Sequence, residues 1–131
     1  MAELFDDEWM KSFQSIWNGE PALKDALAEL GFNSVIGYGM SSEDSARGYV
    51  DIQNGEVVAA GSYDGQELSW DIRADQKNWE KWLSKGIGMA GMGMAVTTGK
   101  MKFKTGDFKA MIKDPRMAGP FIKSFEAMGK V

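Results

Sequence analysis

One stretch predicts the fold most directly: GYVDIQNGEVVAA at residues 48–60. Apolar and polar side chains alternate from Gly48 to Gln53, which is the period-two pattern of a strand with one buried face. Asn54-Gly55 follows, and this pair favours the two-residue type I′ turn because both turn positions take positive φ. Residues 56–60 then form the returning strand. The stretch therefore predicts an antiparallel β-hairpin.

Two further strands are predicted around this hairpin. Residues 35–40 form a short strand before it, and a polar loop at residues 41–45 joins the two. After it, Asp64-Gly65 offers a second tight turn. Residues 67–73 alternate again and would place Leu68, Trp70 and Ile72 on one face. We expect an antiparallel meander with one buried face.

Two helices are predicted before the sheet. Asp6 or Asp7 can cap the first, because a carboxylate accepts bonds from the free amides at a helix start. Its apolar stripe consists of Trp9, Phe13, Ile16 and Trp17, and Asn18-Gly19 ends it. Pro21 suits the first turn of the second helix, whose stripe is Leu23, Leu27 and Leu30 and which ends at Gly31.

More helices and one strand are predicted after the meander. Asp75 is expected to cap a helix that carries Trp79, Trp82 and Leu83 and ends at Gly86. Residues 100–104 alternate, so that Met101 and Phe103 face inward. Asp107 caps a short helix with Phe108, Met111 and Ile112. Asp114-Pro115 interrupts this helix, and Pro120 is expected to begin a closing helix with Phe121, Phe125 and Met128. This order indicates an α+β fold with helices over one face of the sheet.

A run of glycine and methionine, IGMAGMGMAV at residues 87–96, separates the aromatic helix from the last strand. Glycine loses much backbone entropy on ordering, and methionine fills irregular apolar space. The composition suits the deformable wall of an apolar cavity, but it equally suits a core-facing connection. Helix and loop both remain open for this segment.

The composition argues against an enzyme. The 131 residues, expected to form one domain over 1–131, contain no cysteine and no histidine. Thiolate and imidazole chemistry, serine–histidine triads and metal sites built from cysteine or histidine are therefore excluded. Catalysis by a carboxylate, lysine or tyrosine stays open. The acidic pairs Asp6/Asp7 and Glu43/Asp44 are explained by helix capping and a polar loop, so no metal site and no catalytic residue is predicted.

Charge and hydropathy indicate which partners and which cellular location to expect. The net charge is −4, but residues 100–131 carry eight basic and three acidic residues. This basic quarter suits anionic lipid, a CoA-type phosphate or an acidic partner, or it is the solvated face of amphipathic elements. The glycines at 86–93 lack phosphate-loop spacing, and no nucleic-acid motif occurs. The acidic start and the lack of a long apolar run predict a cytoplasmic protein.

The second half of the chain resembles the sterol carrier protein type 2 family of sterol-binding or lipid-transfer domains. Three segments carry the resemblance: the strand and turn at 49–55, LSKG at 83–86, and GKMKFKTGD at 99–107 before a helix with Ala110-Met111. It spans about half the chain, residues 47–113.

The resemblance implies a five-stranded, mainly antiparallel sheet with helices on one face and an apolar tunnel between them. It also implies binding of a sterol, fatty acid, acyl-CoA or other apolar molecule without a cofactor. The Gly/Met run, the last strand and the C-terminal helix would line or gate the tunnel. The expected wall residues are Trp17, Trp70, Trp82, Met89, Met92, Met94, Met101, Phe103, Met111, Phe121 and Phe125.

Three functions follow as hypotheses. The leading one is a non-enzymatic carrier that binds a small hydrophobic molecule, with transfer of that molecule and transient membrane contact left open. The second is an accessory subunit whose apolar face docks on a partner enzyme of hydrophobic-substrate metabolism. The third is an enzyme acting on hydrophobic or CoA-linked substrates, which paired buried carboxylates at a polar pocket would support.

Overall fold

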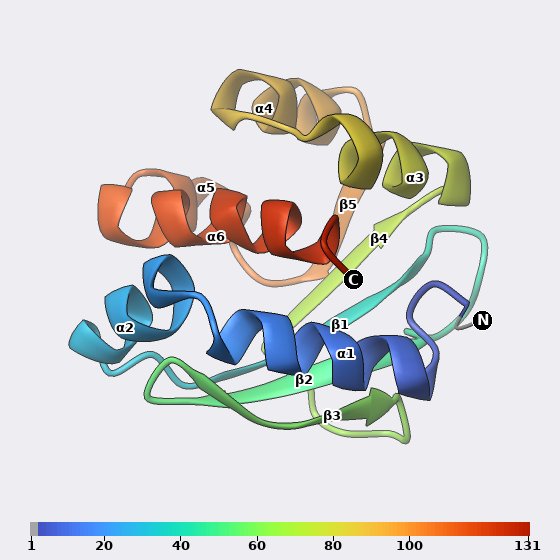
Figure 1. Cartoon of the computed structure of the whole chain (residues 1–131). Coiled ribbons are helices and arrows are strands. Elements are labelled where there is room, and N and C mark those ends of the chain that lie inside the picture. Colours follow the sequence, from blue (N-terminus) through green and yellow to red (C-terminus); the bar gives the residue numbers. More distant parts are fainter. Residues whose placement is uncertain (1–2) are drawn as a thin grey trace.

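A computed structural model describes residues 3–131, and within this range the chain has an α+β fold in which most strands follow one another directly (Figure 1). The elements are α1 (Asp7–Asn18), α2 (Pro21–Glu29), β1 (Ser34–Met40), β2 (Gly48–Gln53), β3 (Glu56–Ser62), β4 (Trp70–Ala74), α3 (Gln76–Lys85), α4 (Met89–Thr97), β5 (Met101–Thr105), α5 (Phe108–Ile112) and α6 (Pro115–Met128). The predicted fold class is confirmed, and the Gly/Met run is a helix, α4.

The five strands form one sheet in the order β3-β2-β1-β4-β5. The pairs β1–β2, β2–β3 and β4–β5 are antiparallel, whereas β1 and β4 are parallel. The predicted meander is therefore wrong at its last step, because β4 does not return onto β3. The strand is also shorter than predicted and begins at Trp70.

Side chains of α1 explain why β4 pairs elsewhere. The amide of Asn18 both donates to and accepts from the backbone of Val57 at 2.9 Å, and Gln14 donates to the same carbonyl at 3.0 Å. At the other end of β3, Asp7 accepts from the Ser62 N–H at 3.2 Å. The outer edge of β3 is thus occupied by a helix. A strand edge covered in this way is closed to another strand.

The predicted hairpin is confirmed, and it is tied to the first helix. Asn54 and Gly55 have φ values of 49° and 81°, as a type I′ turn requires. The indole N–H of Trp17 donates to the Gly55 carbonyl at 2.9 Å. Asp6 caps α1 as predicted, since its carboxylate accepts from the Trp9 N–H at 2.8 Å.

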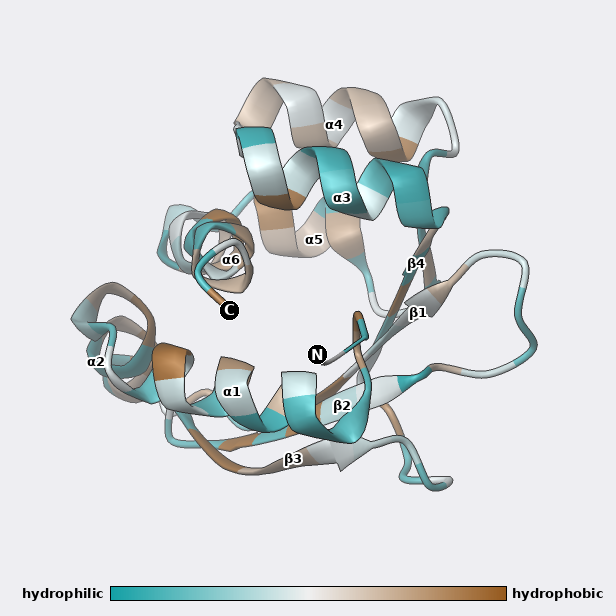
Figure 2. Ribbon diagram, turned by 45° about the vertical axis from the view of Figure 1, so that its right-hand side comes forward, coloured by the Kyte–Doolittle hydropathy of each residue, from teal (hydrophilic) through white to brown (hydrophobic). Residues whose placement is uncertain are grey.

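The helices gather on one face of a curved sheet (Figure 2). On this face Tyr38 of β1 stacks on Phe5, and both rings contact Trp79 of α3. Successive strand residues point to opposite faces, so Gly37 faces away from the helices. A Cβ on Gly37 would overlap the Leu68 side chain. Leu68 therefore lies on the far face and not, as predicted, beside Trp70 and Ile72.

The far face carries a buried ion pair. Arg73 of β4 donates from Nε and Nη2 to the Asp71 carboxylate at 2.6 and 3.0 Å. A third donor, Nη1, reaches the Glu43 carbonyl at 2.8 Å, which holds the loop between β1 and β2 over this face. Glu43 in turn accepts two bonds of 2.8 Å from Arg47.

Two predicted helix starts need correction. Asp75 stands at the N-cap of α3, but its carboxylate accepts from the Ser41 hydroxyl and makes no hydrogen bond to the amides of the helix. The closing helix, α6, begins at Pro115 and not at Pro120. Proline suits the first helical turn, and Asp114 caps this turn by accepting from the Arg116 N–H at 3.0 Å. Pro120 lies inside the helix.

Candidate functional site

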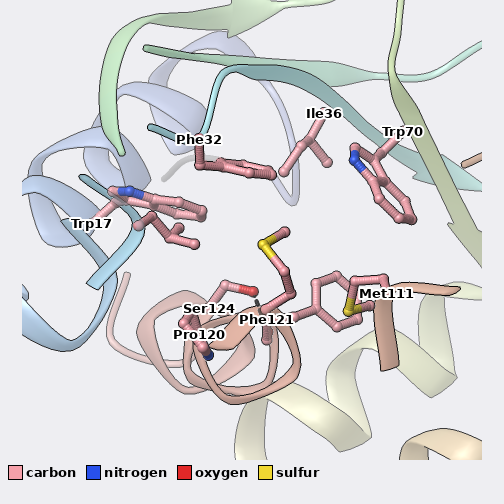
Figure 3. Close-up of a pocket in the computed structure, with 10 residues that line it drawn as sticks. Trp17, Phe32, Ile36, Trp70, Met111, Pro120, Phe121 and Ser124 are labelled. Atoms are coloured by element: carbon pink, nitrogen blue, oxygen red, sulfur yellow. Dashed lines mark hydrogen bonds between the residues drawn. The ribbon is translucent and has the colours of Figure 1, made fainter. Parts of the chain in front are cut away.

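An apolar pocket lies between the sheet and the helices α1, α2, α5 and α6, and we call it the inner pocket (Figure 3). Its walls come from four helices, the strands β1 and β4, and the segment between α2 and β1. They converge because the helices turn their apolar stripes toward the sheet. The lining residues are Trp17, Leu27, Phe32, Ile36, Trp70, Met111, Met117, Pro120, Phe121 and Ser124.

The walls of the inner pocket carry no charged side chain. Two polar wall groups already bond within the protein: Trp17 donates to Gly55, and the Ser124 hydroxyl donates to the Phe121 carbonyl one turn earlier in α6. A charged group entering the pocket would lose its hydration without gaining a counter-charge. The arrangement therefore favours an apolar occupant.

The inner pocket is narrow, with a cavity volume of about 30 Å³. That is room for a few water molecules at most, whereas ligand pockets commonly measure about 300–1,000 Å³. Two flexible methionines, Met111 and Met117, form part of the wall and can adopt other rotamers. Pro120 lacks the N–H that would continue the backbone ladder of α6, so the helix is weaker at this wall.

The inner pocket opens toward a shallow depression, which we call the mouth. Trp70, Met111 and Met117 belong to both, and Asp107, Ala110 and Asp114 complete the mouth. Asp107 caps α5 through the Ala110 N–H at 3.0 Å. Hydrogen bonds from the side chain and the amide of Arg116 hold the pKa of Asp114 below its usual value. The rim is thus polar and charged at neutral pH, while the interior is apolar.

A second hollow, the outer groove, lies along β5 and measures about 510 Å³. Val96, Gly99, Met101, Lys102, Phe103, Gly106, Asp107, Phe108 and Lys109 line it. The Phe103 ring contacts Phe108 in the groove, with ring centroids 5.1 Å apart. It also contacts Trp70 and Phe121 of the inner pocket, at 5.9 and 6.0 Å. One aromatic ring therefore separates the two hollows.

The structure divides the eleven predicted wall residues into four groups. Four line the inner pocket: Trp17, Trp70, Met111 and Phe121. Two line the outer groove: Met101 and Phe103. Three are buried in the core: Trp82, Met92 and Phe125. The remaining two, Met89 and Met94, lie on the solvent side of α4 with 43% and 64% of their surface exposed, and they line neither hollow.

Six wall residues of the inner pocket were missed: Leu27, Phe32, Ile36, Met117, Pro120 and Ser124. A helix started at Pro115 places Met117, Phe121 and Ser124 at i, i+4 and i+7, on one face. The expected start at Pro120 hid that stripe. The polar hydroxyl of Ser124 also made this stripe hard to recognise in the sequence. In the structure the hydroxyl donates to its own helix, so Ser124 can stand in an apolar wall as a small residue.

Over residues 3–131 no three acidic side chains come together as a metal site would need. None of the helices in this range is long and apolar enough to cross a membrane.

Solved structures of other proteins resemble this chain. No family model matches the sequence, and no curated protein matches it either. A crystal structure of sterol carrier protein 2 matches with a TM-score of 0.77 and 18% identity, over 98% of this chain and 99% of that one. A conserved hypothetical protein from Thermus thermophilus, described as possibly a sterol carrier protein, matches with a TM-score of 0.65 and 19% identity, over 96% and 90% of the two chains.

A third solved structure, the UbiJ-SCP2 ubiquinone synthesis protein, matches with a TM-score of 0.59 and 11% identity, over 93% of this chain and 88% of that one. These matches cover nearly the whole chain, well beyond the half that carried the sequence resemblance. The resemblance is confirmed at the level of the fold: the chain has the fold of sterol carrier protein 2.

Proposed function

We propose that the protein binds a small hydrophobic molecule, such as a fatty acid, an acyl chain or a sterol-like lipid, in the inner pocket. The observation that carries the proposal is the pocket wall itself: ten side chains from both sides of the core converge on it, and none is charged. Apolar burial is the main driving force that such a wall offers. Likeness to sterol carrier protein 2 structures supports the same class of ligand.

Binding requires the inner pocket to widen, because its present volume is about 30 Å³. The wall contributed by α5 and α6 is the part suited to move. The helix α5 has only five residues, and α6 contains Pro120. Met111 and Met117 can follow a ligand's shape through their rotamers. In this scheme the ligand opens the pocket from the mouth, and α1 with the sheet provides the fixed wall.

The test is a titration of delipidated protein with palmitic acid and, separately, with cholesterol, followed by tryptophan fluorescence and native mass spectrometry. Saturable binding with a change in emission is expected. The change should shrink in Trp17→Phe and Trp70→Phe, whose indoles line the pocket, and persist in Trp82→Phe, which lies in the core. If neither ligand binds and no apolar species co-purifies, the proposal fails.

A second candidate is an accessory role beside an enzyme of hydrophobic-substrate metabolism. The fold likeness to a ubiquinone synthesis protein favours it. In this role the chain would form a stable complex with its partner enzyme. Affinity capture of the full chain from its native host, followed by mass spectrometry, tests it. A single enzyme recovered in stoichiometric amount is expected, and recovery of no protein at that level would contradict it.

A further inference from the structure

One face of α4 is apolar and exposed to solvent. Met92 and Ala95 face inward and are buried, and the helix packs mainly on β5. Met89 and Met94 point outward, with 43% and 64% of their surface exposed. The outward residues between and after them are alanine, glycine and threonine, so this face carries no charge. Figure 1 shows α4 at the top of the molecule, at the opposite end from β3.

The glycines of α4 are not explained by the fold. Inside α4, Gly93 has no other atom within 4 Å of where a Cβ would lie, Gly91 has only the Ile87 Cγ1 at 3.4 Å, and neither glycine has a positive φ. Nothing packs closely against them, and no turn requires them. Glycine inside a helix lowers its intrinsic stability. A helix that is weak by itself and apolar on its outer face is suited to stabilisation by a surface outside the protein.

The flanks of α4 are strongly basic. Residues 76–109 carry seven basic and two acidic residues, a net charge of +5, whereas the rest of the chain has a net charge of −9. Five exposed lysines surround the apolar face in sequence: Lys81, Lys85, Lys100, Lys102 and Lys104. No salt bridge recorded for residues 3–131 uses any of them. α3 lies beside α4 in Figures 1 and 2, and α4 packs on β5, so both neighbours of this helix bring positive charge without a recorded salt bridge to this end of the molecule.

We propose that α4 is a membrane-docking element, which lies on an anionic bilayer surface with Met89 and Met94 inserted and the flanking lysines at the phosphates. The apolar side chains come from α4 and the lysines from the elements next to it, so this surface can interact with both lipid chains and lipid charge. A second copy of the chain would bring the same positive charge to the interface. An anionic bilayer complements it.

The outer groove connects this surface with the inner pocket. Val96 of α4 lines the groove together with Met101 and Phe103. Phe103 contacts Trp70 and Phe121, which belong to the wall of the inner pocket. Docking through α4 therefore places the groove next to the bilayer and Phe103 between the bilayer and the pocket. This supplies a route by which a membrane lipid reaches the proposed site without crossing water.

The test is flotation of the full-length protein with vesicles of phosphatidylcholine, alone or with about 30% phosphatidylserine. Binding is expected with phosphatidylserine and at least about tenfold weaker without it, and it should fall when salt is raised to about 0.5 M because the Debye length shortens. Equal binding to both vesicle types, or no binding to either, would overturn the proposal.

Matched variants separate the docking face from general surface effects. Met94→Glu and Met89→Glu should each reduce binding to the anionic vesicles at least about tenfold, since each puts a charge at the insertion site. Val58→Glu is the control, because Val58 on β3 is 46% exposed but lies at the other end of the molecule. Lys100→Gln with Lys102→Gln should weaken binding, and Lys24→Gln on α2 should not. Equal losses in the test and control variants would refute the assignment to α4.

Two further readouts keep this inference distinct from the proposed function. Met94→Glu should still bind palmitic acid in solution, because Met94 does not line the inner pocket. If the wild-type protein binds anionic vesicles but no ligand, the docking inference stands and the proposed function fails. Sedimentation velocity tests the competing occupant: a dimer that Met94→Glu disrupts, without vesicle binding by the wild type, would assign the face to a second copy.

Discussion

Gly106 and Trp70 lie so close together that no side chain fits between them. A Cβ built on Gly106 would overlap the six-membered ring of Trp70, and Gly106 also has a φ of 106°, which other residues rarely adopt. The turn between β5 and α5 therefore holds the Trp70 indole against the inner pocket. A glycine at this place serves the pocket wall as well as the turn.

We predict that Gly106→Ala displaces Trp70 and weakens ligand binding. The new methyl group leaves the ring no room, so the indole must rotate away from the pocket, and the backbone conformation adds strain of about 1–3 kcal/mol. Tryptophan emission should shift to longer wavelength, and the affinity for palmitic acid should fall. Fluorescence spectra and the ligand titration measure both effects.

Gly65→Ala is the matched control for this substitution. Gly65 has a φ of 86°, but nothing lies within 4 Å of its would-be Cβ. It carries the same kind of backbone strain without the overlap. Loss of stability with normal emission and normal ligand affinity is expected. If the two variants bind ligand equally well, Gly106 does not position Trp70 for binding.

A second prediction concerns the volume of the inner pocket. Met117 is half-buried and belongs both to the pocket and to its mouth. Met117→Trp should fill the space into which the ligand must enter and weaken binding at least about tenfold, equivalent to about 1.4 kcal/mol. Displacement of a fluorescent fatty acid measures the affinity. Val58→Trp, outside the pocket, controls for the added indole, and undiminished binding by Met117→Trp would place the ligand elsewhere.

Local sequence rules predicted those parts of the fold that local conformation decides. The hairpin followed from Asn54-Gly55, because few other pairs adopt two positive φ values, and α1 followed from its Asp6 cap and aromatic stripe. The parallel pairing of β1 with β4 did not follow. It depends on Gln14 and Asn18 of α1 occupying the edge of β3, and such contacts between distant segments leave no periodic signal.

The residues of the candidate site could likewise be predicted only in part. Trp17, Trp70, Met111 and Phe121 were predicted because each is large, apolar and on a stripe. Stripes alone do not distinguish a cavity wall from solid core, and Trp82, which lies on an equally regular stripe, is core. Composition left residues 87–96 open between a cavity wall and a core-facing connection, and the family resemblance favoured the wall. Their place on α4, with two methionines turned to solvent, is set by how that helix packs on β5.

A third prediction uses the pH dependence of stability. Burial raises the pKa of Tyr38 above its ordinary value near 10. The unfolded chain therefore releases this proton at a lower pH than the folded protein does. The stabilisation is complete below about pH 10 and is lost as the pH rises further, by up to about 1.4 kcal/mol per pH unit.

Tyr38→Phe removes this titration and keeps the ring that stacks on Phe5. Urea unfolding from about pH 8 to about pH 11 should show a smaller loss of unfolding free energy for the variant than for the wild type. The many lysines contribute equally to both proteins, so the difference between them reports on Tyr38. Parallel curves above about pH 10 would mean that the folded protein lets this phenol ionise as freely as the unfolded chain.

The last prediction contrasts two arginine–carboxylate pairs on the far face of the sheet. Removal of one partner of a buried pair leaves a charge without water or counter-ion, which costs about 3–5 kcal/mol, whereas an exposed pair contributes about 0–1 kcal/mol. Arg73 and Asp71 have side-chain exposures of 2% and 12%, and Arg47 and Glu43 have 33% and 42%. Urea unfolding should therefore show a large loss of unfolding free energy for Arg73→Ala and a small one for Arg47→Ala.

The double variant Asp71→Leu/Arg73→Met, which removes both charges, should recover much of the loss. Ligand affinity should not change, because the pair lies across the sheet from the inner pocket. If the double variant is as unstable as Arg73→Ala, the bond from Arg73 to the Glu43 carbonyl, rather than the ion pair, stabilises this face.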